Sequence, residues 1–242
     1  MNIQIIHEPN KDENYILAIK ERNIPTAPLD WQDKNNFLAK LIELYPQITK
    51  VKGRKEIEYG LIHRIDTATQ GLVLVALDQT TYDNLIELQA QNKITKYYRA
   101  ITNKIDNNRD KLQAFPEINI GEDELKEGVD IKSYFRFYGK GRKEVRPVAE
   151  NSSQIALKKV DKKVIYKTNI KLIENYCDNY IFDCKITNGF RHQVRCHLSW
   201  INYPIVGDTL YNCQEINKRS GNQLEFTAYK IEIDSKFFTY EF

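Results

Sequence analysis

The feature that most constrains the fold is one continuous apolar run, GLVLVAL, at residues 71–77. An apolar run of strand length predicts a buried strand. Asp78 follows it at the position of a helix N-cap, ahead of a helical stretch at 80–92 in which Leu85 and Leu88 can face the core. The sequence therefore predicts a central strand followed closely by a helix.

Strands outnumber helices in the rest of the chain. A helix is predicted at 35–45, ended by Pro46, and another after Gly189, where Val194, Leu198 and Ile201 recur at helical spacing. A loop is expected at 24–30, and a loop or an insertion at 103–130. Strands are predicted at 13–19, 96–102, 164–173, 180–187 and 226–233, with 238–242 as a further candidate. Many strands with few helices predict an α+β fold with a mixed sheet, not a parallel doubly wound one.

Length and composition exclude several classes of protein. The chain has 242 residues, enough for one large or two small domains, and a formal net charge of +3. No apolar run approaches the roughly 18 residues of a membrane span, and the N-terminus lacks the pattern of a secretory signal. We therefore expect a cytoplasmic protein with reduced thiols. Its four cysteines match neither a zinc pattern nor a disulfide framework: Cys177, Cys184, Cys196 and Cys213.

Positive charge is concentrated between Lys132 and Lys167, where eleven Lys or Arg face three Asp or Glu. Aromatic residues are interleaved with these cations, which suits a polyanion with stacking bases, that is, a nucleic acid. A solvated face on a Lys-rich protein gives the same composition. Charge alone leaves both interpretations open.

The stretch HRIDTATQG at 63–71 runs straight into the predicted buried strand. Asp66 in this position suits a carboxylate held at a cleft, but an ordinary turn, in which Asp and Thr bond their own backbone, gives the same pattern. A protein-kinase catalytic loop is excluded, because Asp does not directly follow Arg64 and the chain has no Gly-rich phosphate loop.

Two more stretches carry residues capable of chemistry. In KYYRA at 96–100, Tyr98 is by itself best explained as a core residue of an aromatic strand. In NGFRHQVRCHL at 188–198, Arg195 lies near the start of an amphipathic helix, where its stem can be buried while its guanidinium reaches a carboxylate.

The same region was considered as a metal site. His192 and Cys196 are four residues apart on the predicted helix, but a third ligand at useful spacing is lacking, so no metal is expected. YPIVGDTLY at 203–211 predicts a structural turn at Gly207-Asp208.

In order and spacing, these four pieces resemble the signatures of the RluA-type pseudouridine synthases. With x for any residue and h for a hydrophobic one, those signatures read HRLDxxTSG, KxYxA, TGRxHQIRxHL and hxPIxGDxxY. The resemblance spans roughly residues 1–212. It implies the pseudouridine synthase fold, with a mixed, mostly antiparallel sheet, flanking helices and a central catalytic cleft. It also implies that uridine is isomerised to pseudouridine in ribosomal or transfer RNA, by base flipping and an aspartate-dependent rearrangement of the glycosidic bond, without cofactor or metal.

The resemblance assigns roles to particular residues. Asp66 matches the catalytic aspartate and Arg195 the arginine that pairs with it, which a buried carboxylate needs in order to stay ionised. Tyr98 matches the tyrosine beneath the target base, and Arg64 the arginine that fills the place vacated by the flipped base. The other expected substrate-binding residues are His63, Thr69, Arg191, His192 and Gln193.

The sequence departs from the family pattern at three places. Gln70 stands where the family has serine, and the arginine of Thr-Gly-Arg-x-His is displaced by one position to Arg191. Of the N-terminal Lys-Pro-x-Gly segment only Lys20 is present. These departures fall on expected substrate contacts and not on the catalytic residues.

We expect residues 1–242 to form a single catalytic domain, without a separate N-terminal RNA-binding domain, that acts as a monomer on structured RNA. One alternative is a catalytically inactive RNA-binding or ribosome-assembly protein on the same fold. The other is an unrelated basic interaction module, which would not require Asp66 and Arg195 to meet.

Overall fold

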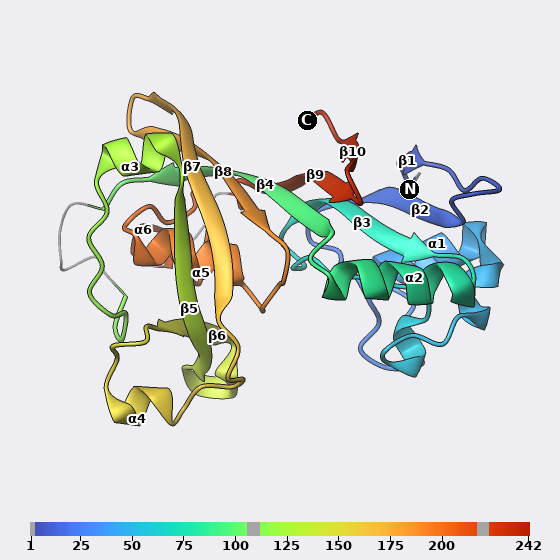
Figure 1. The fold of residues 1–242 in the computed structure, drawn as a ribbon, viewed down its shortest axis with the longest axis horizontal. Helices are drawn as coiled ribbons and strands as arrows, with labels where there is room; N and C mark the ends of the chain where they lie inside the picture. Colours follow the sequence, from blue (N-terminus) through green and yellow to red (C-terminus); the bar gives the residue numbers. More distant parts are fainter. Residues whose placement is uncertain (1–2, 106–111, 217–222) are drawn as a thin grey trace. The chain divides into compact units, whose positions relative to one another are not determined.

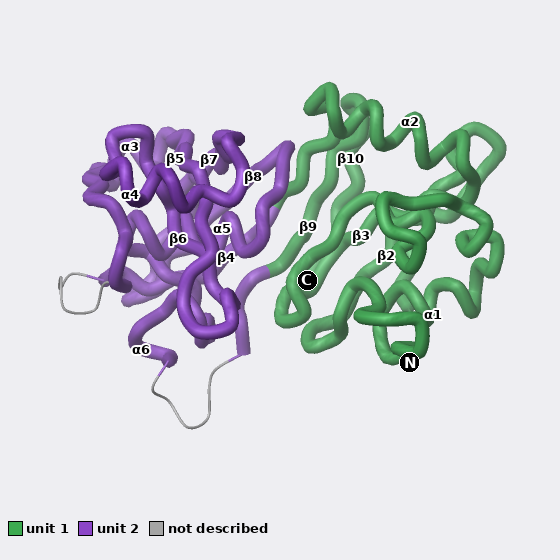
Figure 2. Tube along the Cα trace, turned by 90° about the horizontal axis from the view of Figure 1, so that it is seen from below, with its two compact units in different colours: residues 1–97, 227–242 green, residues 98–226 purple. Residues whose placement is uncertain are grey.

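The chain divides into two compact units in the computed structural model, which describes residues 3–105, 112–216 and 223–242. Unit 1 comprises residues 1–97 and 227–242, and unit 2 comprises residues 98–226 (Figure 2). The chain leaves unit 1 within strand β4, Ile94–Asn103, and returns to it within strand β9, Phe226–Ile233. The expectation of a single catalytic domain stays a prediction.

Unit 1 is built on a mixed sheet. Strand β2, Tyr15–Lys20, pairs antiparallel with β1, Ile5–His7, and with β3, Gln70–Ala76. Strand β3 also pairs with β9, in parallel, through Gln70 opposite Thr227 and Gly71 opposite Ala228, and β10, Lys236–Thr239, pairs antiparallel with β9. The predicted strand at 71–77 is therefore an inner strand, and every residue of it from Gly71 onward is buried.

Gly71 permits the parallel pairing of β3 and β9. Its φ is +132°, a conformation that side chains rarely adopt, and a Cβ atom there would lie 2.1 Å from the carbonyl oxygen of Ala228. Only glycine allows this close approach of two backbones.

The two helices of unit 1 begin at side-chain caps. Helix α1, Phe37–Leu44, is capped by Asn36, and α2, Gln79–Ala90, by Asp78, whose Oδ1 accepts from the Thr81 amide at 2.8 Å. Tyr82 and Leu85 of α2 pack into a core shared with alternate residues of the strands, Leu17 and Ile19 of β2 and Leu72 and Leu74 of β3. Both predicted helices are confirmed, and so is Asp78 as a cap.

Unit 2 is an antiparallel sheet wrapped against one buried helix. Its strand order is β4-β8-β7-β5-β6, with β5 at Val129–Tyr138, β6 at Glu144–Val148, β7 at Tyr166–Tyr176 and β8 at Asn179–Ile186. Helix α5, Gln193–Trp200, is buried along its whole length. Figure 1 shows α5 behind β5 and β7, with the short helices α3, Glu122–Glu127, and α4, Gln154–Leu157, at the margins of the unit. A further short helix, α6, spans Cys213–Ile216.

The face of the sheet that covers α5 is set by the alternation of strand β7. Tyr166, Thr168 and Ile170 are buried, and the Thr168 hydroxyl lies 2.8 Å from Nδ1 of His197 in α5. The intervening residues Lys167 and Lys171 are exposed, because successive side chains of a strand point to opposite faces.

The predicted α+β class and all the predicted strands are confirmed, with bounds shifted by up to about three residues. Residues 103–130 were expected to be a loop or an insertion. They contain α3 and the start of β5, so the loop interpretation was wrong for these stretches; residues 106–111 lie outside the described residues. The basic segment at 132–167, left unassigned, contains most of β5, all of β6 and helix α4. In the described parts of the chain no helix is both long and apolar enough to span a bilayer. The cysteines are free thiols. The central cleft stays a prediction.

Candidate active site

Asp66 lies in unit 1, in the turn that leads into strand β3, and is partly buried. The Thr69 amide donates to the Asp66 carbonyl oxygen at 3.0 Å, which closes the turn. On the other side, the buried hydroxyl of Thr26 donates to the Ile65 carbonyl oxygen at 2.6 Å. The backbone on both sides of Asp66 is therefore held, and the carboxylate is presented from a fixed turn.

Lys20, at the end of strand β2, places a buried amine in the electric field of Asp66. Its Nζ donates to the carbonyl oxygens of Glu21 and Ile24, each at 2.8 Å, and of Thr67 at 3.1 Å. Burial lowers the pKa of Lys20 from its usual 10.5 to about 7, against the opposing attraction of Asp66. Lys20 thus ties the turn after Asp66 to the sheet.

The two residues that precede this turn have different surroundings. His63 receives the Leu74 amide hydrogen at Nε2, 3.3 Å, and burial lowers its pKa to about 3, so the ring is neutral and carries its proton on Nδ1. That Nδ1 is buried without a hydrogen-bond partner among the described residues. Arg64 is exposed, and its Nη1 lies 2.8 Å from Oε1 of Glu58.

Thr69 and Gln70 complete the motif in unit 1. The Thr69 hydroxyl is buried and has no hydrogen-bond partner in the described part of the chain. Gln70, at the position of the family's serine, donates from Nε2 to the Tyr240 hydroxyl at 2.6 Å. The longer side chain therefore bonds to the C-terminal segment of the same unit.

In unit 2, Tyr98 is buried in strand β4, and its ring stacks on Phe226 with centroids 5.0 Å apart and planes 12° from parallel. The next residue, Arg99, forms an ion pair with Asp183 of β8 at 2.9 Å. The expectation of a core tyrosine is confirmed as to burial, and the contact of Tyr98 with a target base stays a prediction.

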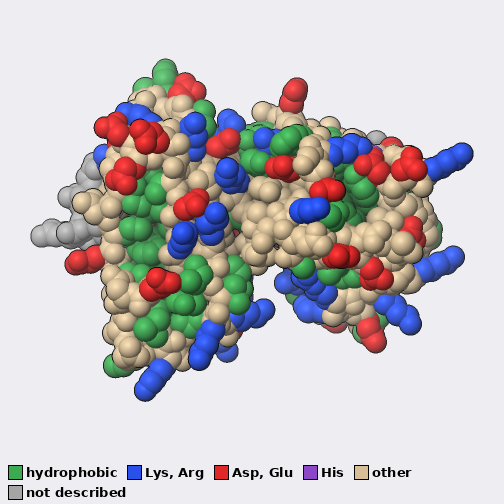
Figure 3. Space-filling model, in the orientation of Figure 1, with side chains coloured by type: hydrophobic (Ala, Val, Ile, Leu, Met, Phe, Trp, Pro, Cys, Tyr) green, Lys and Arg blue, Asp and Glu red, His purple; other side chains and the backbone are tan. Residues whose placement is uncertain are grey.

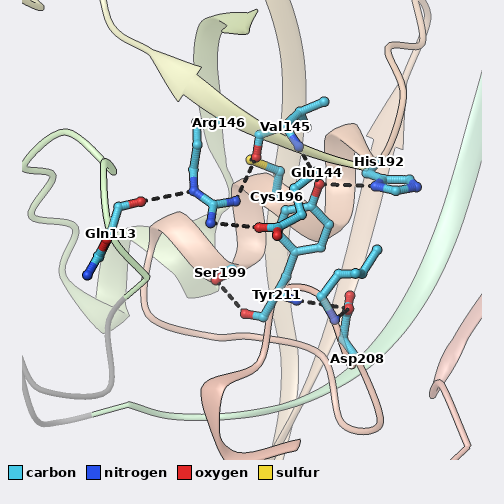
Figure 4. Close-up of polar contacts among 10 residues, drawn as sticks. Gln113, Glu144, Val145, Arg146, His192, Cys196, Ser199, Asp208 and Tyr211 are labelled. Atoms are coloured by element: carbon cyan, nitrogen blue, oxygen red, sulfur yellow. Dashed lines mark hydrogen bonds and ion pairs between the residues drawn. The ribbon is translucent and has the colours of Figure 1, made fainter. Parts of the chain in front are cut away.

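Arg195 and Asp208 form a buried bidentate ion pair within unit 2. Nε of Arg195 lies 2.7 Å from Oδ2 of Asp208, and Nη2 lies 2.8 Å from Oδ1. The backbone amide of Leu210 also donates to Oδ1, at 2.9 Å. The backbone amide of Tyr211 does so at 3.0 Å (Figure 4). Asp208 was expected only as a turn residue; it also orients the arginine.

Tyr211 connects this pair to His192. The Arg195 guanidinium lies 5.3 Å from the centre of the Tyr211 ring. The Tyr211 hydroxyl accepts from the Val145 amide at 2.9 Å and lies 3.0 Å from Nδ1 of His192 (Figure 4). Burial raises the pKa of Tyr211, so the hydroxyl keeps its proton. One buried tyrosine thus positions two of the predicted site residues.

The remaining predicted residues surround the start of α5. Gln193 is buried, and its amide bonds to the Phe190 amide, to the Lys167 carbonyl oxygen and to the Thr168 hydroxyl, at 2.9, 3.0 and 3.0 Å. Arg191 is exposed. A contact of either residue with substrate stays a prediction, although Gln193 already serves to hold the loop.

The predicted residues are divided between the two units. His63, Arg64, Asp66 and Thr69 belong to unit 1, whereas Tyr98, Arg191, His192, Gln193 and Arg195 belong to unit 2. The pairing of Asp66 with Arg195 joins residues of different units and stays a prediction.

Sequence reasoning did not predict that Lys20, Asp208 and Tyr211 position parts of the candidate site. A signal was present for each. Lys20 ends an otherwise apolar strand, where a buried cation needs partners. Asp208 and Tyr211 lie three residues apart in a turn, the spacing at which an aspartate accepts backbone amides.

Comparisons with known proteins agree on one family. A family model described as RNA pseudouridylate synthase matches residues 14–200. The chain is 23% identical over 211 residues to "Ribosomal large subunit pseudouridine synthase D" of Neisseria meningitidis, covering 87% of this chain and 46% of the relative. It is 27% identical over 198 residues to an "Uncharacterized RNA pseudouridine synthase" of Helicobacter pylori, covering 81% and 66%. The chain thus spans about half the length of the synthase D relative.

Solved structures agree on the fold. "Human RNA Pseudouridylate Synthase Domain Containing 1" superposes with a TM-score of 0.65 at 17% identity, covering 99% of this chain and 83% of that one. The corresponding "Domain Containing 4" protein gives a TM-score of 0.64, also at 17% identity, with coverages of 98% and 88%.

Proposed function

This chain belongs to the RNA pseudouridylate synthase family, and from this premise we infer that it isomerises uridine to pseudouridine in RNA. The observation that carries the proposal is the extent of the family match, residues 14–200, which includes Asp66, Tyr98 and Arg195. The fixed turn at Asp66, with the amine of Lys20 held nearby, supports it further.

The reaction breaks the bond between the ribose C1′ and N1 of uracil, turns the base and joins C1′ to C5. C5 then loses its proton, and N1, freed from the sugar, gains one. The atoms of substrate and product are the same. We assign to the Asp66 carboxylate the attack on sugar or base that accompanies the first bond cleavage. The target uridine must leave its stack to reach the carboxylate, which costs a few kcal/mol.

The other residues have supporting roles in this proposal. Tyr98 packs against the flipped base or takes a proton from it, and Arg195 stabilises the Asp66 carboxylate as an ion. Arg64 fills the place of the flipped base, for which its exposed side chain must leave Glu58, 2.8 Å away. Both units would therefore contribute residues to one catalytic domain.

As substrate we propose ribosomal RNA of the large subunit, because synthase D relatives carry that substrate in their name. We further propose that the protein acts as a monomer in the cytoplasm, where such RNA is made. Light scattering on the purified protein, alone and with RNA, tests the oligomeric state.

The test is a map of pseudouridines in ribosomal and transfer RNA from cells with and without the gene. We expect defined sites to vanish on deletion and to return with the wild-type gene but not with Asp66→Asn. Asp83→Asn, an exposed aspartate on α2, is the matched control and should restore the sites. The purified Asp66→Asn protein should still bind the RNA.

Two results would contradict the proposal. Sites that return with Asp66→Asn would exclude this carboxylate from catalysis. A complete map that does not change on deletion, for a protein that nevertheless binds ribosomal RNA, would favour the inactive RNA-binding protein on the same fold.

A further inference from the structure

Four exposed cations lie at one end of unit 2. Three belong to the turn between β5 and β6, and the fourth, Arg191, precedes α5. We call them the tip surface: Lys140, Arg142, Lys143 and Arg191. In Figure 3, Lys and Arg side chains gather at the end of unit 2 where Figure 1 places α4 and the β5–β6 turn.

Direct contacts hold the two parts of the tip surface together. Nη1 of Arg191 lies 3.5 Å from the carbonyl oxygen of Arg142. The Arg142 guanidinium lies over the ring of Phe137, 4.5 Å from its centre, and that ring is 6.0 Å from the ring of Phe190. The residue before Arg191 and the strand that leads to Arg142 therefore share one aromatic cluster.

This arrangement explains why the arginine is displaced by one position. Phe190 stands where the family has its arginine, and its ring stacks on Phe135 with centroids 5.0 Å apart and planes 2° from parallel. It also contacts Tyr166, with ring centres 5.0 Å apart. With Phe190 anchored inside unit 2, the arginine that follows it points to the surface beside the β5–β6 turn.

The backbone of the turn between β5 and β6 has a defined conformation, with three residues at positive φ. Gly139, Gly141 and Arg142 have φ angles of 75°, 71° and 52°. The strands that carry the turn are in register from Tyr134 opposite Val148 to Tyr138 opposite Glu144. A surface that is already formed loses little conformational entropy on binding.

The charge of the tip surface is not neutralised locally. Among the described residues none of its four cations has an ion-pair partner. The nearest acid in the sequence, Glu144, is bound to the buried Arg146 at 2.7 Å. Four cations without ion-pair partners, three of them on the β5–β6 turn, suit an extended polyanion, whose binding releases counterions.

We propose that the tip surface binds phosphates of the RNA substrate, and that Arg191 acts there together with the β5–β6 turn. This inference rests on the proposed function for the identity of the RNA. It assigns affinity to the tip surface, and leaves bond breaking to the residues of the candidate active site.

The test compares two triple variants of equal charge. The first is Lys140→Gln/Lys143→Gln/Arg191→Gln, which spares Arg142 because that side chain also packs on Phe137. The control is Lys132→Gln/Lys171→Gln/Lys185→Gln, three exposed cations on the sheet face that points away from α5. The probe is an unmodified transcript of large-subunit ribosomal RNA from the source organism, and its binding is measured by filter binding from 50 to 300 mM KCl.

For the first variant we expect the slope of log Kd against log salt to fall by about 2, from the loss of three phosphate contacts. We also expect KM for the RNA to rise about tenfold near 150 mM salt with kcat unchanged. The control should keep the wild-type slope and KM. Circular dichroism of each variant verifies that unit 2 is folded.

Each other outcome overturns one proposal and not the other. If the first variant keeps the wild-type slope, or if the control loses as much, the tip surface is not the phosphate site, whatever the activity. If the first variant loses affinity but the wild-type protein modifies no RNA, the tip surface stands as an RNA-binding site and the proposed function fails.

Discussion

Asp208→Asn should destabilise unit 2 more than most single substitutions would. The substitution keeps the shape of the side chain but removes the negative charge from a pair of hydrogen bonds to Arg195, 2.7 and 2.8 Å long, with both residues buried. It also turns an amide group toward a guanidinium that can only donate. Breaking a buried ion pair from one side costs about 3–5 kcal/mol, so we expect the free energy of unfolding to fall by at least about 3 kcal/mol.

Urea unfolding followed by tryptophan fluorescence measures this loss in the right unit. Of the two tryptophans, Trp200 is buried in α5, five residues after Arg195, whereas Trp31 of unit 1 is 64% exposed. The change in emission on unfolding therefore reports mainly on unit 2. Asp178→Asn, in the exposed turn between β7 and β8, is the control and should change the free energy by less than about 0.5 kcal/mol.

A double-mutant cycle tests whether the loss comes from the pair itself. Arg195→Met alone leaves the carboxylate buried, so it should also destabilise, and the double variant should cost less than the sum of the two single variants. We expect a coupling free energy of at least about 2 kcal/mol. A coupling below about 0.5 kcal/mol would refute the assignment of Asp208 as the residue that orients Arg195.

Two further predictions concern buried polar groups. Tyr211→Phe should lower the free energy of unfolding by about 1–3 kcal/mol, because the Val145 amide loses its buried acceptor. The control Tyr176→Phe changes an exposed tyrosine and should leave this free energy unchanged. Equal free energies of unfolding for the two variants in urea would contradict the hydrogen bonds assigned to the Tyr211 hydroxyl. Lys20 has a pKa of about 7 when folded and about 10.5 when unfolded, so the unfolded chain holds more protons between these values and stability should rise with pH across that window, by at most about 5 kcal/mol. That contribution to stability is complete above pH 10.5 and gone below about pH 7. When the free energy of unfolding is measured from pH 7 to 10, it should rise less steeply with pH in Lys20→Met than in the wild-type protein. An identical rise in the two proteins would show that Lys20 is not the group responsible.

The main strands and helices of unit 1 could be predicted because their signals are local, whereas the short strand β1, Ile5–His7, was not predicted. The apolar run at 71–77 and the cap at Asp78 each act within a few residues, and both are confirmed. The hairpin of β5 and β6 was missed because its residues alternate aromatic with cationic side chains, which also suits a solvated face. Cation–ring contacts such as Arg146 over Tyr138, 4.4 Å from the ring centre, place these side chains together in a way that hydropathy does not reveal.

The candidate site could be predicted only as far as its motifs reach. The motifs identify Asp66, Tyr98 and Arg195, but not that Asp208 binds the arginine, because that contact depends on how the turn at 205–211 packs against α5. The role of Lys20 likewise depends on three carbonyl oxygens, two of them in the loop after β2 and one beyond Asp66. Partners supplied by the backbone leave no pattern in the side chains of a single sequence.

The division of unit 1 into two stretches has a consequence for synthesis of the protein. Strand β3 is made early, but its parallel neighbour β9 follows about 150 residues later, after all of unit 2. At 5–20 residues per second, β3 waits on the order of ten seconds or more for that neighbour. During this time Gly71 has not yet paired with Ala228, and the edge of β3 that β9 later covers is open to pairing with other chains. Strand β9, which is made after all of unit 2, therefore supplies the late pairing partner of the strand that follows Asp66.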